Sequence, residues 1–182
     1  MEEVKSIRKE LAYKGSIIDV YKDYVQMPDG KVVEWDFVDH KGASAVLPVT
    51  SDGKIVMVKQ YRNALNRVTL EIPAGGINPG ETPYESAVRE LTEETGYRSD
   101  EVTHLKDIVS AIGFCNETIY IYLAENLKPA KQNLDEDEFL DVYEYPLEEV
   151  IELILSNQII DGKTTAAVLA YAMKRERENN KA

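Results

Sequence analysis

Hydrophobic positions along the chain first follow the two-residue period of β-strands and later the 3.6-residue period of helices. In residues 31–40, the apolar side chains of Val33, Trp35 and Phe37 alternate with acidic residues, a pattern that predicts a half-buried strand. Residues 16–27 form a strand candidate before it, and a Pro-Asp-Gly turn separates the two. The pattern therefore predicts an antiparallel strand region near the N-terminus.

Continuous apolar runs take over after this region. Residues 44–50 and 54–62 are joined by Ser-Asp-Gly, which predicts a hairpin. Residues 146–158 and 163–180 predict two closing helices. Strands thus dominate early and helices late, which favours an α+β or mixed-sheet sandwich over a doubly wound fold. The remaining strand candidates are residues 68–76, 101–110, 118–127 and 139–146.

Between the two halves lies one helix whose ends are well marked. Thr82 is suited to be an N-cap, Pro83 fits the first helical position, and Glu85 completes a capping box. Gly96 is placed for a left-handed C-cap. We therefore expect a helix over about residues 83–95.

This helix carries a cluster of glutamates. Glu90 and Glu94 lie one turn apart at the flank of the apolar face, and Cβ atoms at that spacing are roughly 5–6 Å apart. Their carboxylates could converge on one hard cation, although a solvated acidic helix is the alternative. Arg89 can pair with Glu93, four residues later. The apolar face, which should pack on a sheet, consists of Tyr84, Ala87, Val88, Leu91 and Thr95.

The helix and the loop before it resemble the signature of the Nudix hydrolases. Residues 75–97 match the pattern Gly-x5-Glu-x7-Arg-Glu-apolar-x-Glu-Glu-x-Gly-apolar at every position. The resemblance extends over most of residues 42–182. It implies an α+β fold, a mixed-sheet α/β/α sandwich following an N-terminal antiparallel strand region. It also implies hydrolysis of a nucleoside diphosphate linked to another group.

The resemblance assigns roles to residues of this motif. Glu90, Glu94 and the backbone carbonyl of Ala74 are the implied ligands of Mg²⁺, for which Mn²⁺ is a possible substitute. Glu93 matches a position that is a ligand or an orienting group in some members, and Arg89 would hold it in place.

The loop before the helix has roles of its own. Gly75 and Gly76 let the backbone approach a pyrophosphate closely. The resemblance implies that Glu81 supports this loop.

Within the family, the stretches Leu-Glu-Ile-Pro-Ala-Gly and Val-Lys-Gln-Tyr-Arg resemble the ADP-ribose pyrophosphatase branch. This resemblance implies that residues 1–41 build a homodimer and that residues 42–182 form the catalytic domain. Trp35 would stack on the adenine, and Arg62 would contact phosphate. The alternatives are that Trp35 fills a strand core and that Arg62 is simply solvated.

Two later loops complete the implied site. In the acidic loop, Glu136 is expected to be the general base and Glu138 a helper or metal contact. Without the resemblance, this loop would be read as solvent-facing. Gly113 and Phe114 match a loop that borders the terminal ribose in that branch. Ile112 occupies a position where ADP-ribose-cleaving relatives usually carry proline.

Composition narrows the possible partners. The net charge of -12 argues against nucleic acid as a partner. A single cysteine, Cys115, excludes an internal disulfide and fits a reducing, cytoplasmic location. No signal peptide or run of 18 apolar residues is visible, so no membrane partner is expected. The resemblance implies the nucleotide sugar ADP-ribose as substrate, cleaved to AMP and ribose 5-phosphate. The alternatives are another nucleotide sugar, a dinucleoside polyphosphate, or a non-catalytic ligand-sensing module.

Overall fold

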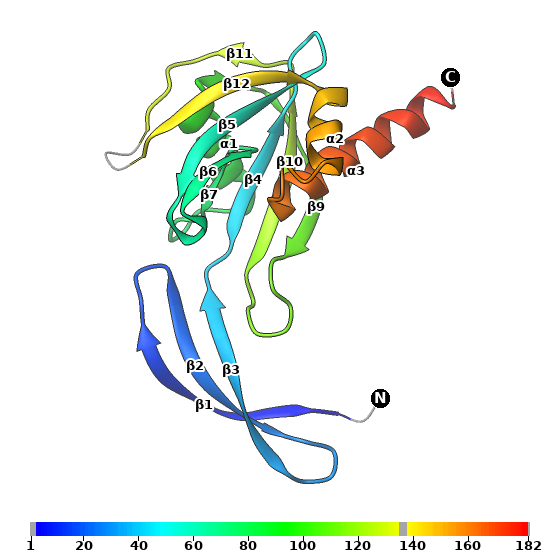
Figure 1. Cartoon of the computed structure of the whole chain (residues 1–182). Coiled ribbons are helices and arrows are strands. Elements are labelled where there is room, and N and C mark those ends of the chain that lie inside the picture. Colours follow the sequence, from blue (N-terminus) through cyan, green and yellow to red (C-terminus); the bar gives the residue numbers. More distant parts are fainter. Residues whose placement is uncertain (1–2, 135–137, 182) are drawn as a thin grey trace. The chain divides into compact units, whose positions relative to one another are not determined.

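The structure, a computed structural model, describes residues 3–134 and 138–181 and divides into two compact units. The smaller unit comprises Met1–Gly42 with Val109–Thr118, and the larger unit comprises Ala43–Ile108 with Ile119–Ala182. Figure 1 labels the elements of both units. None of the helices in the described ranges combines the length and the apolar character that a membrane crossing needs.

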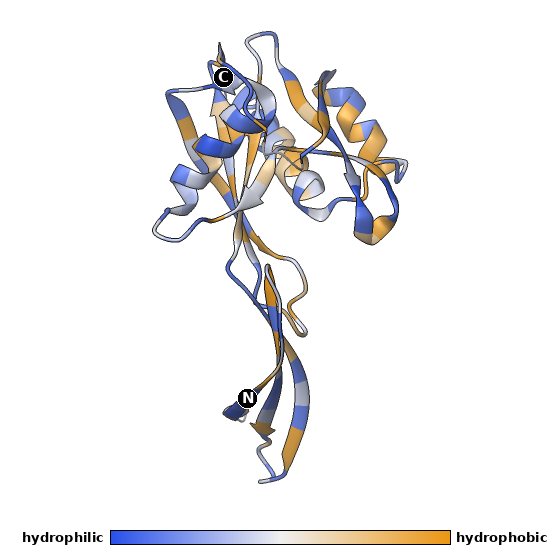
Figure 2. Cartoon of the chain, turned by 90° about the vertical axis from the view of Figure 1, so that its left-hand side faces the viewer, coloured by the Kyte–Doolittle hydropathy of each residue, from blue (hydrophilic) through white to orange (hydrophobic). Residues whose placement is uncertain are grey.

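The smaller unit is built on an antiparallel sheet of three strands in the order β1-β2-β3. Alternating apolar and hydrophilic colours follow these strands in Figure 2. The turn before β3 forms as predicted, because Gly30 takes a φ of 85° and donates to the carbonyl of Met27 at 2.9 Å. The strands are β1 (Lys5–Lys14), β2 (Ile18–Gln26) and β3 (Val32–His40).

Two features of this sheet differ from the prediction. The strand β1 was not predicted, because every one of its side chains is exposed and its existence depends on backbone pairing with β2. Trp35 is 49% exposed in the chain, whereas Val33 and Phe37 are half-buried. The expected half-buried pattern therefore fails at Trp35, which does not fill a core within the described chain.

The larger unit contains a mixed sheet in the order β7-β4-β10-β9. β4 runs parallel to β10 and antiparallel to β7, which confirms the mixed pairing. A second sheet has the order β12-β5-β6 and is antiparallel. The strands of the two sheets are β4 (Ala43–Pro48), β5 (Lys54–Arg62), β6 (Arg67–Glu71), β7 (Ala74–Gly76), β9 (Glu101–Val109), β10 (Thr118–Glu125) and β12 (Leu140–Pro146).

Smaller elements connect these sheets. The 3-10 turn η1 (Asn63–Leu65) links β5 to β6. The short strands β8 (Tyr97–Arg98) and β11 (Lys128–Pro129) pair antiparallel with each other. The predicted hairpin before β5 is present, with Gly53 at a φ of 82°. These connections leave the ends of β5 and β6 close to each other, with Arg62 paired to Arg67.

Three helices pack on the sheets and close the core. α1 (Pro83–Thr95) packs against β4 and β7, α2 (Leu147–Leu155) against β5, and α3 (Gly162–Asn179) against β4. The core between them is aliphatic and includes Leu47, Ile55 and Met57, each fully buried. The last turns of α3 are hydrophilic and exposed, as Figure 2 shows.

Candidate active site

The helix α1 has the ends that the sequence predicts. The side chain of Thr82 accepts a hydrogen bond from the backbone of Glu85, and Glu85 in turn accepts one from the backbone of Thr82. Pro83 begins the helix, and Gly96 ends it with a φ of 69°. Such a capping box satisfies two backbone donors at the helix start, so local interactions determine where the helix begins.

The buried face of α1 is rotated from the predicted one. Tyr84 is 45% exposed and touches Tyr122 only edge-on, with ring centroids 5.9 Å apart. In its place, Ser86, Glu90 and Glu94 are buried together with Ala87 and Leu91. The glutamates therefore do not merely flank the packed face; they belong to it, because their carboxylates meet the loop formed by β7.

That loop approaches the helix closely at one glycine. A Cβ atom on Gly75 would lie 2.0 Å from Oε1 of Glu90 and 2.4 Å from its Cδ. A Cβ atom on Gly76 would meet nothing within 4 Å. Gly75 is therefore the residue that makes room for the Glu90 carboxylate beneath the loop.

Arg89 connects the helix to the loop. Its guanidinium donates to Glu81 at 2.8 Å, to Glu90 at 2.6 Å and to Glu93 at 2.9 Å. It also donates to the carbonyl of Gly76 at 3.0 Å. These contacts raise the pKa of the Arg89 guanidinium above its usual range, with the Glu81 hydrogen bond as the largest cause. The predicted pairing of Arg89 with Glu93 is confirmed.

Glu81 links the loop before α1 to the helix itself. Its carboxylate accepts the Arg89 hydrogen bonds and one from the backbone N–H of Asn78 at 3.0 Å. The Arg89 contact, together with the Asn78 bond, holds the pKa of the Glu81 carboxyl below its usual range. These bonds are consistent with the supporting role inferred for Glu81.

The carboxyl groups of Glu90 and Glu94 both have a raised pKa. Burial raises the pKa of the Glu94 carboxyl to about 8, and the charges of Glu90 and Glu138 add to the effect. The backbone N–H of Ala74, 3.3 Å from Oε2 of Glu94, opposes it only partly. Burial likewise raises the pKa of the Glu90 carboxyl, with Arg89 acting in the opposite direction.

This arrangement fits a divalent cation. Burial disfavours the ionised form of both carboxylates, and the charge of Glu90 adds to this effect at Glu94, so a nearby cation would stabilise the ionised pair. Carboxylate and backbone carbonyl oxygens are the ligands that hard cations such as Mg²⁺ prefer. Within residues 3–134 and 138–181, no group of three or more His, Cys, Asp or Glu side chains is already arranged to hold a metal ion.

A second charged cluster, which the sequence analysis missed, lies at the ends of β5 and β6. Arg62 donates from Nε and Nη2 to the two carboxylate oxygens of Glu71, each at 2.8 Å. Lys163, in the first turn of α3, also donates to Glu71. Arg62 is therefore not simply solvated. The sequence does contain one signal for this cluster: Glu71 is an acidic residue between the apolar Leu70 and Ile72, a pattern that can indicate a buried carboxylate with a partner.

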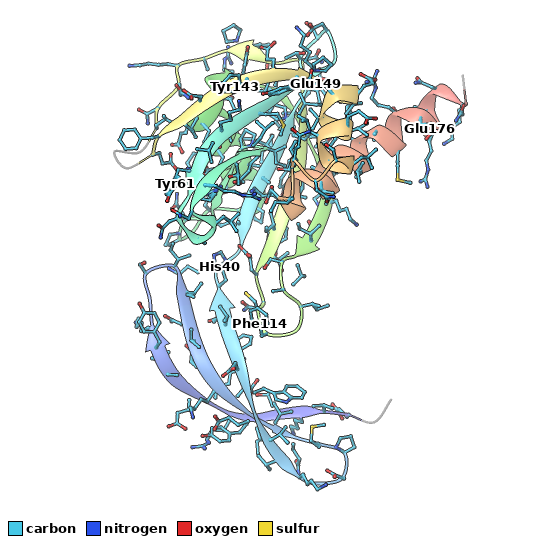
Figure 3. The ribbon with its side chains drawn as sticks, in the orientation of Figure 1. His40, Tyr61, Phe114, Tyr143, Glu149 and Glu176 are labelled. Carbon is cyan, nitrogen blue, oxygen red and sulfur yellow. The ribbon has the colours of Figure 1, made fainter. Side chains whose placement is uncertain are left out.

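The remaining predicted residues divide between the two units. Glu138 belongs to the larger unit, and its charge raises the pKa of both Glu90 and Glu94. Glu136 lies outside the described residues. Trp35, Gly113 and Phe114 belong to the smaller unit, where the carbonyl of Phe114 accepts from Val38 at 2.7 Å. Figure 3 shows Phe114 in the loop beside β3.

The sequence and the fold are similar to those of known proteins. The model of the NUDIX domain matches residues 39–168. The chain is 43% identical to an ADP-ribose pyrophosphatase of Bacillus subtilis (strain 168), over 94% of each chain. It is 40% identical to a methanol dehydrogenase activator of Bacillus methanolicus, over 91% of each chain. A crystal structure of an ADP compounds hydrolase shares the fold, with a TM-score of 0.86, 21% identity, and coverage of 98% of this chain and 97% of that one.

Proposed function

The chain belongs to the Nudix family, and from this premise we propose that it hydrolyses the pyrophosphate bond of ADP-ribose to give AMP and ribose 5-phosphate. The observation that carries the proposal is the buried pair of Glu90 and Glu94 beneath the Gly75 loop. The similarity to an ADP-ribose pyrophosphatase supports the choice of substrate. In the reaction, one water molecule adds across the P–O–P bridge, so that one phosphorus gains the hydroxyl oxygen and the other keeps the bridging oxygen.

We propose that the cofactor is Mg²⁺, with Mn²⁺ as a substitute. Glu90, Glu94 and the backbone carbonyl of Ala74 would hold it. When bound, the cation supplies positive charge to the phosphate oxygens and lowers the pKa of the attacking water. Burial raises the pKa of both carboxyls, and a cation bound between them would oppose that shift, which supports this ligand set.

The chain's own residues bind and orient the substrate around this centre. Arg62 donates from Nε and Nη2 to the carboxylate of Glu71. Its Nη1 donates no hydrogen bond to a described residue. A guanidinium held in this way can offer its remaining N–H groups to a phosphate. Arg89 keeps Glu93 and the loop carbonyl of Gly76 in fixed positions.

We propose that Glu136 is the general base and that Glu138 assists it. The effect of Glu138 on the pKa of Glu90 and Glu94 supports a position of Glu138 near the proposed cation. A base at this point takes a proton from the attacking water, so its removal should slow the chemical step without weakening cation binding.

We propose that residues 1–41 mediate a homodimer and that Trp35 stacks on the adenine. The exposed apolar side chains of the N-terminal strands, Ile7, Leu11, Tyr13 and Trp35 among them, support the dimer. Gly113 and Phe114 would border the terminal ribose. Sedimentation at micromolar concentration tests the dimer, and a monomeric chain would remove both the dimer and any shared adenine site.

A substrate panel tests the proposed reaction. ADP-ribose, GDP-mannose, NADH, diadenosine polyphosphates and a dNTP are each incubated with the protein and Mg²⁺, and products are separated by anion-exchange chromatography. The proposal expects the highest kcat/KM for ADP-ribose. A preference for a non-adenine nucleotide would overturn the substrate but keep the broader pyrophosphohydrolase activity. Absence of hydrolysis across the panel would favour a ligand-sensing module.

A further inference from the structure

We propose that Lys163 is a positioning residue for substrate binding: it neutralises Glu71 and Asp161, so that the guanidinium of Arg62 is left oriented toward an anionic group of the substrate. The inference rests on the proposed function, because it takes the anion to be the substrate pyrophosphate. It concerns a lysine that lies 92 residues from its partner Glu71 in the sequence and outside the glutamate-rich helix α1.

Glu71 is the centre of the cluster. It is only 3% exposed, yet four donor groups use its two carboxylate oxygens. Arg62 donates twice at 2.8 Å, and Thr69 donates at 2.6 Å to the oxygen that also accepts from Nε of Arg62. Lys163 donates to the other oxygen. Burial would raise the pKa of the Glu71 carboxyl, but Arg62 and Lys163 outweigh it and lower that pKa to about 2.

Lys163 also forms an ion pair with a second acidic residue, Asp161. Its ammonium lies 3.1 Å from Oδ2 of Asp161, the N-cap of α3. The same Asp161 oxygen accepts from the backbone of Thr164 at 3.0 Å. Lys163 is itself 9% exposed, and a lysine is almost never this buried unless its charge is paired. The helix start, the lysine and the strand carboxylate therefore form one fixed unit.

The charges of this cluster balance. Arg62 and Lys163 contribute two positive charges, and Glu71 and Asp161 contribute two negative ones. Without Lys163, Arg62 alone would face both acids, and the cluster would carry one net negative charge. An anionic substrate would then meet repulsion, and the guanidinium would be drawn toward the acids.

The cluster also lines open space. A cavity of about 410 Å³ is lined by Arg62, Glu71, Asp161 and Lys163, together with Thr69 and Leu65. Arg62 and Lys163 therefore line a cavity that an anionic group of the substrate could enter.

The test compares charge variants in steady-state kinetics with ADP-ribose and Mg²⁺. We expect Lys163→Met to raise KM about tenfold, equivalent to about 1.4 kcal/mol, with kcat within about threefold. Lys163→Arg, which keeps the charge, should recover most of the affinity. The double variant Asp161→Asn with Lys163→Met restores the charge balance and keeps a residue that can cap α3. It should therefore bind better than Lys163→Met alone.

Lys59→Met is the matched control. Lys59 lies on β5, as Arg62 does, and its ammonium is 4.3 Å from the centre of the Tyr143 ring. Its loss removes the same charge outside the cluster and should leave KM unchanged. Folding of every variant is followed by thermal denaturation. A Lys163→Met protein that melts earlier but keeps its KM would overturn the positioning role, as would an equal rise of KM in Lys59→Met.

Calorimetric titration with inorganic pyrophosphate and Mg²⁺ separates this inference from the proposed function. If the unaltered protein hydrolyses no compound of the panel, the proposed function fails. Lys163 would still be supported by a pyrophosphate affinity that falls about tenfold in Lys163→Met and recovers in the charge-balanced double variant. Equal pyrophosphate affinity in the parent and in Lys163→Met would overturn the inference by itself.

Discussion

Replacing Gly75 by alanine should disable cation binding without unfolding the protein. The new Cβ would lie 2.0 Å from Oε1 and 2.4 Å from Cδ of Glu90, distances that real Cβ atoms do not tolerate. Gly75 has no positive φ, so alanine can adopt the backbone conformation. The conflict must therefore be relieved by the flexible end of the Glu90 side chain, which is the end that we assign to the cation.

The magnitude follows from the contact that Glu90 would lose. Its carboxylate accepts from Nη1 of Arg89 at 2.6 Å. Displacement also removes Glu90 as a ligand of the cation, and a ligand worth as much as a hydrogen bond to a charged group, about 1.5–3 kcal/mol, corresponds to a ~10- to ~100-fold loss of apparent cation affinity. Global stability should fall only moderately, because the lost Arg89 hydrogen bond, about 1.5–3 kcal/mol, is partly offset by the lower entropy of the unfolded alanine chain, about 0.4–1 kcal/mol in favour of folding.

The assay is the dependence of turnover on Mg²⁺ concentration, with thermal denaturation in EDTA as the measure of stability. Gly76→Ala is the control, because a Cβ at the neighbouring glycine meets nothing within 4 Å. We expect Gly75→Ala to require much more Mg²⁺ and Gly76→Ala to follow the parent. Identical Mg²⁺ curves for the two variants would refute the account of Gly75 and Glu90.

The site makes four other predictions. Glu94→Gln should lower turnover more than tenfold at fixed Mg²⁺, above about 1.4 kcal/mol in barrier. The pKa of Glu94 is raised from 4.5 to about 8 in the folded protein. Its protonation therefore stabilises the fold fully below pH 4.5, and this stabilisation is lost as the pH rises through about 8. Denaturation in EDTA should therefore show a decline in this window that is weaker in Glu94→Gln; an equal decline contradicts the assignment. Glu136→Gln should lower kcat at an unchanged Mg²⁺ requirement, and an unchanged rate would place the base elsewhere. Ile112→Pro should sharpen discrimination among nucleoside diphosphate sugars by up to about tenfold in relative kcat/KM, and an identical ranking would make Ile112 neutral.

The helix α1 could be predicted to the residue because its limits depend on local chemistry. A capping threonine, a proline and a terminal glycine act within a few residues of one another, so their effect is visible in the sequence. The pairing of Arg89 with Glu93 is equally local, at one helical turn. Periodicity also located the central strands, where continuous apolar runs become the buried core.

Features that depend on distant partners could not be predicted. The burial of Glu90 and Glu94 depends on the strand that contains Gly75, and this strand meets the helix only in the folded chain. The prediction therefore placed the exposed Tyr84 on the packed face and left these two glutamates at its edge. The contact between Glu71 and Lys163 spans 92 residues. No local signal reveals that a lysine at a helix start will be buried against a strand carboxylate.

The most direct test of the central claim is the rate of AMP formation from ADP-ribose with and without a divalent cation. The protein is stripped with EDTA, assayed, and assayed again after Mg²⁺ is restored in excess. The account predicts no AMP in EDTA and full recovery with Mg²⁺, with ribose 5-phosphate formed in equal amount. AMP formation at the same rate in EDTA, or none in the presence of Mg²⁺, would contradict it.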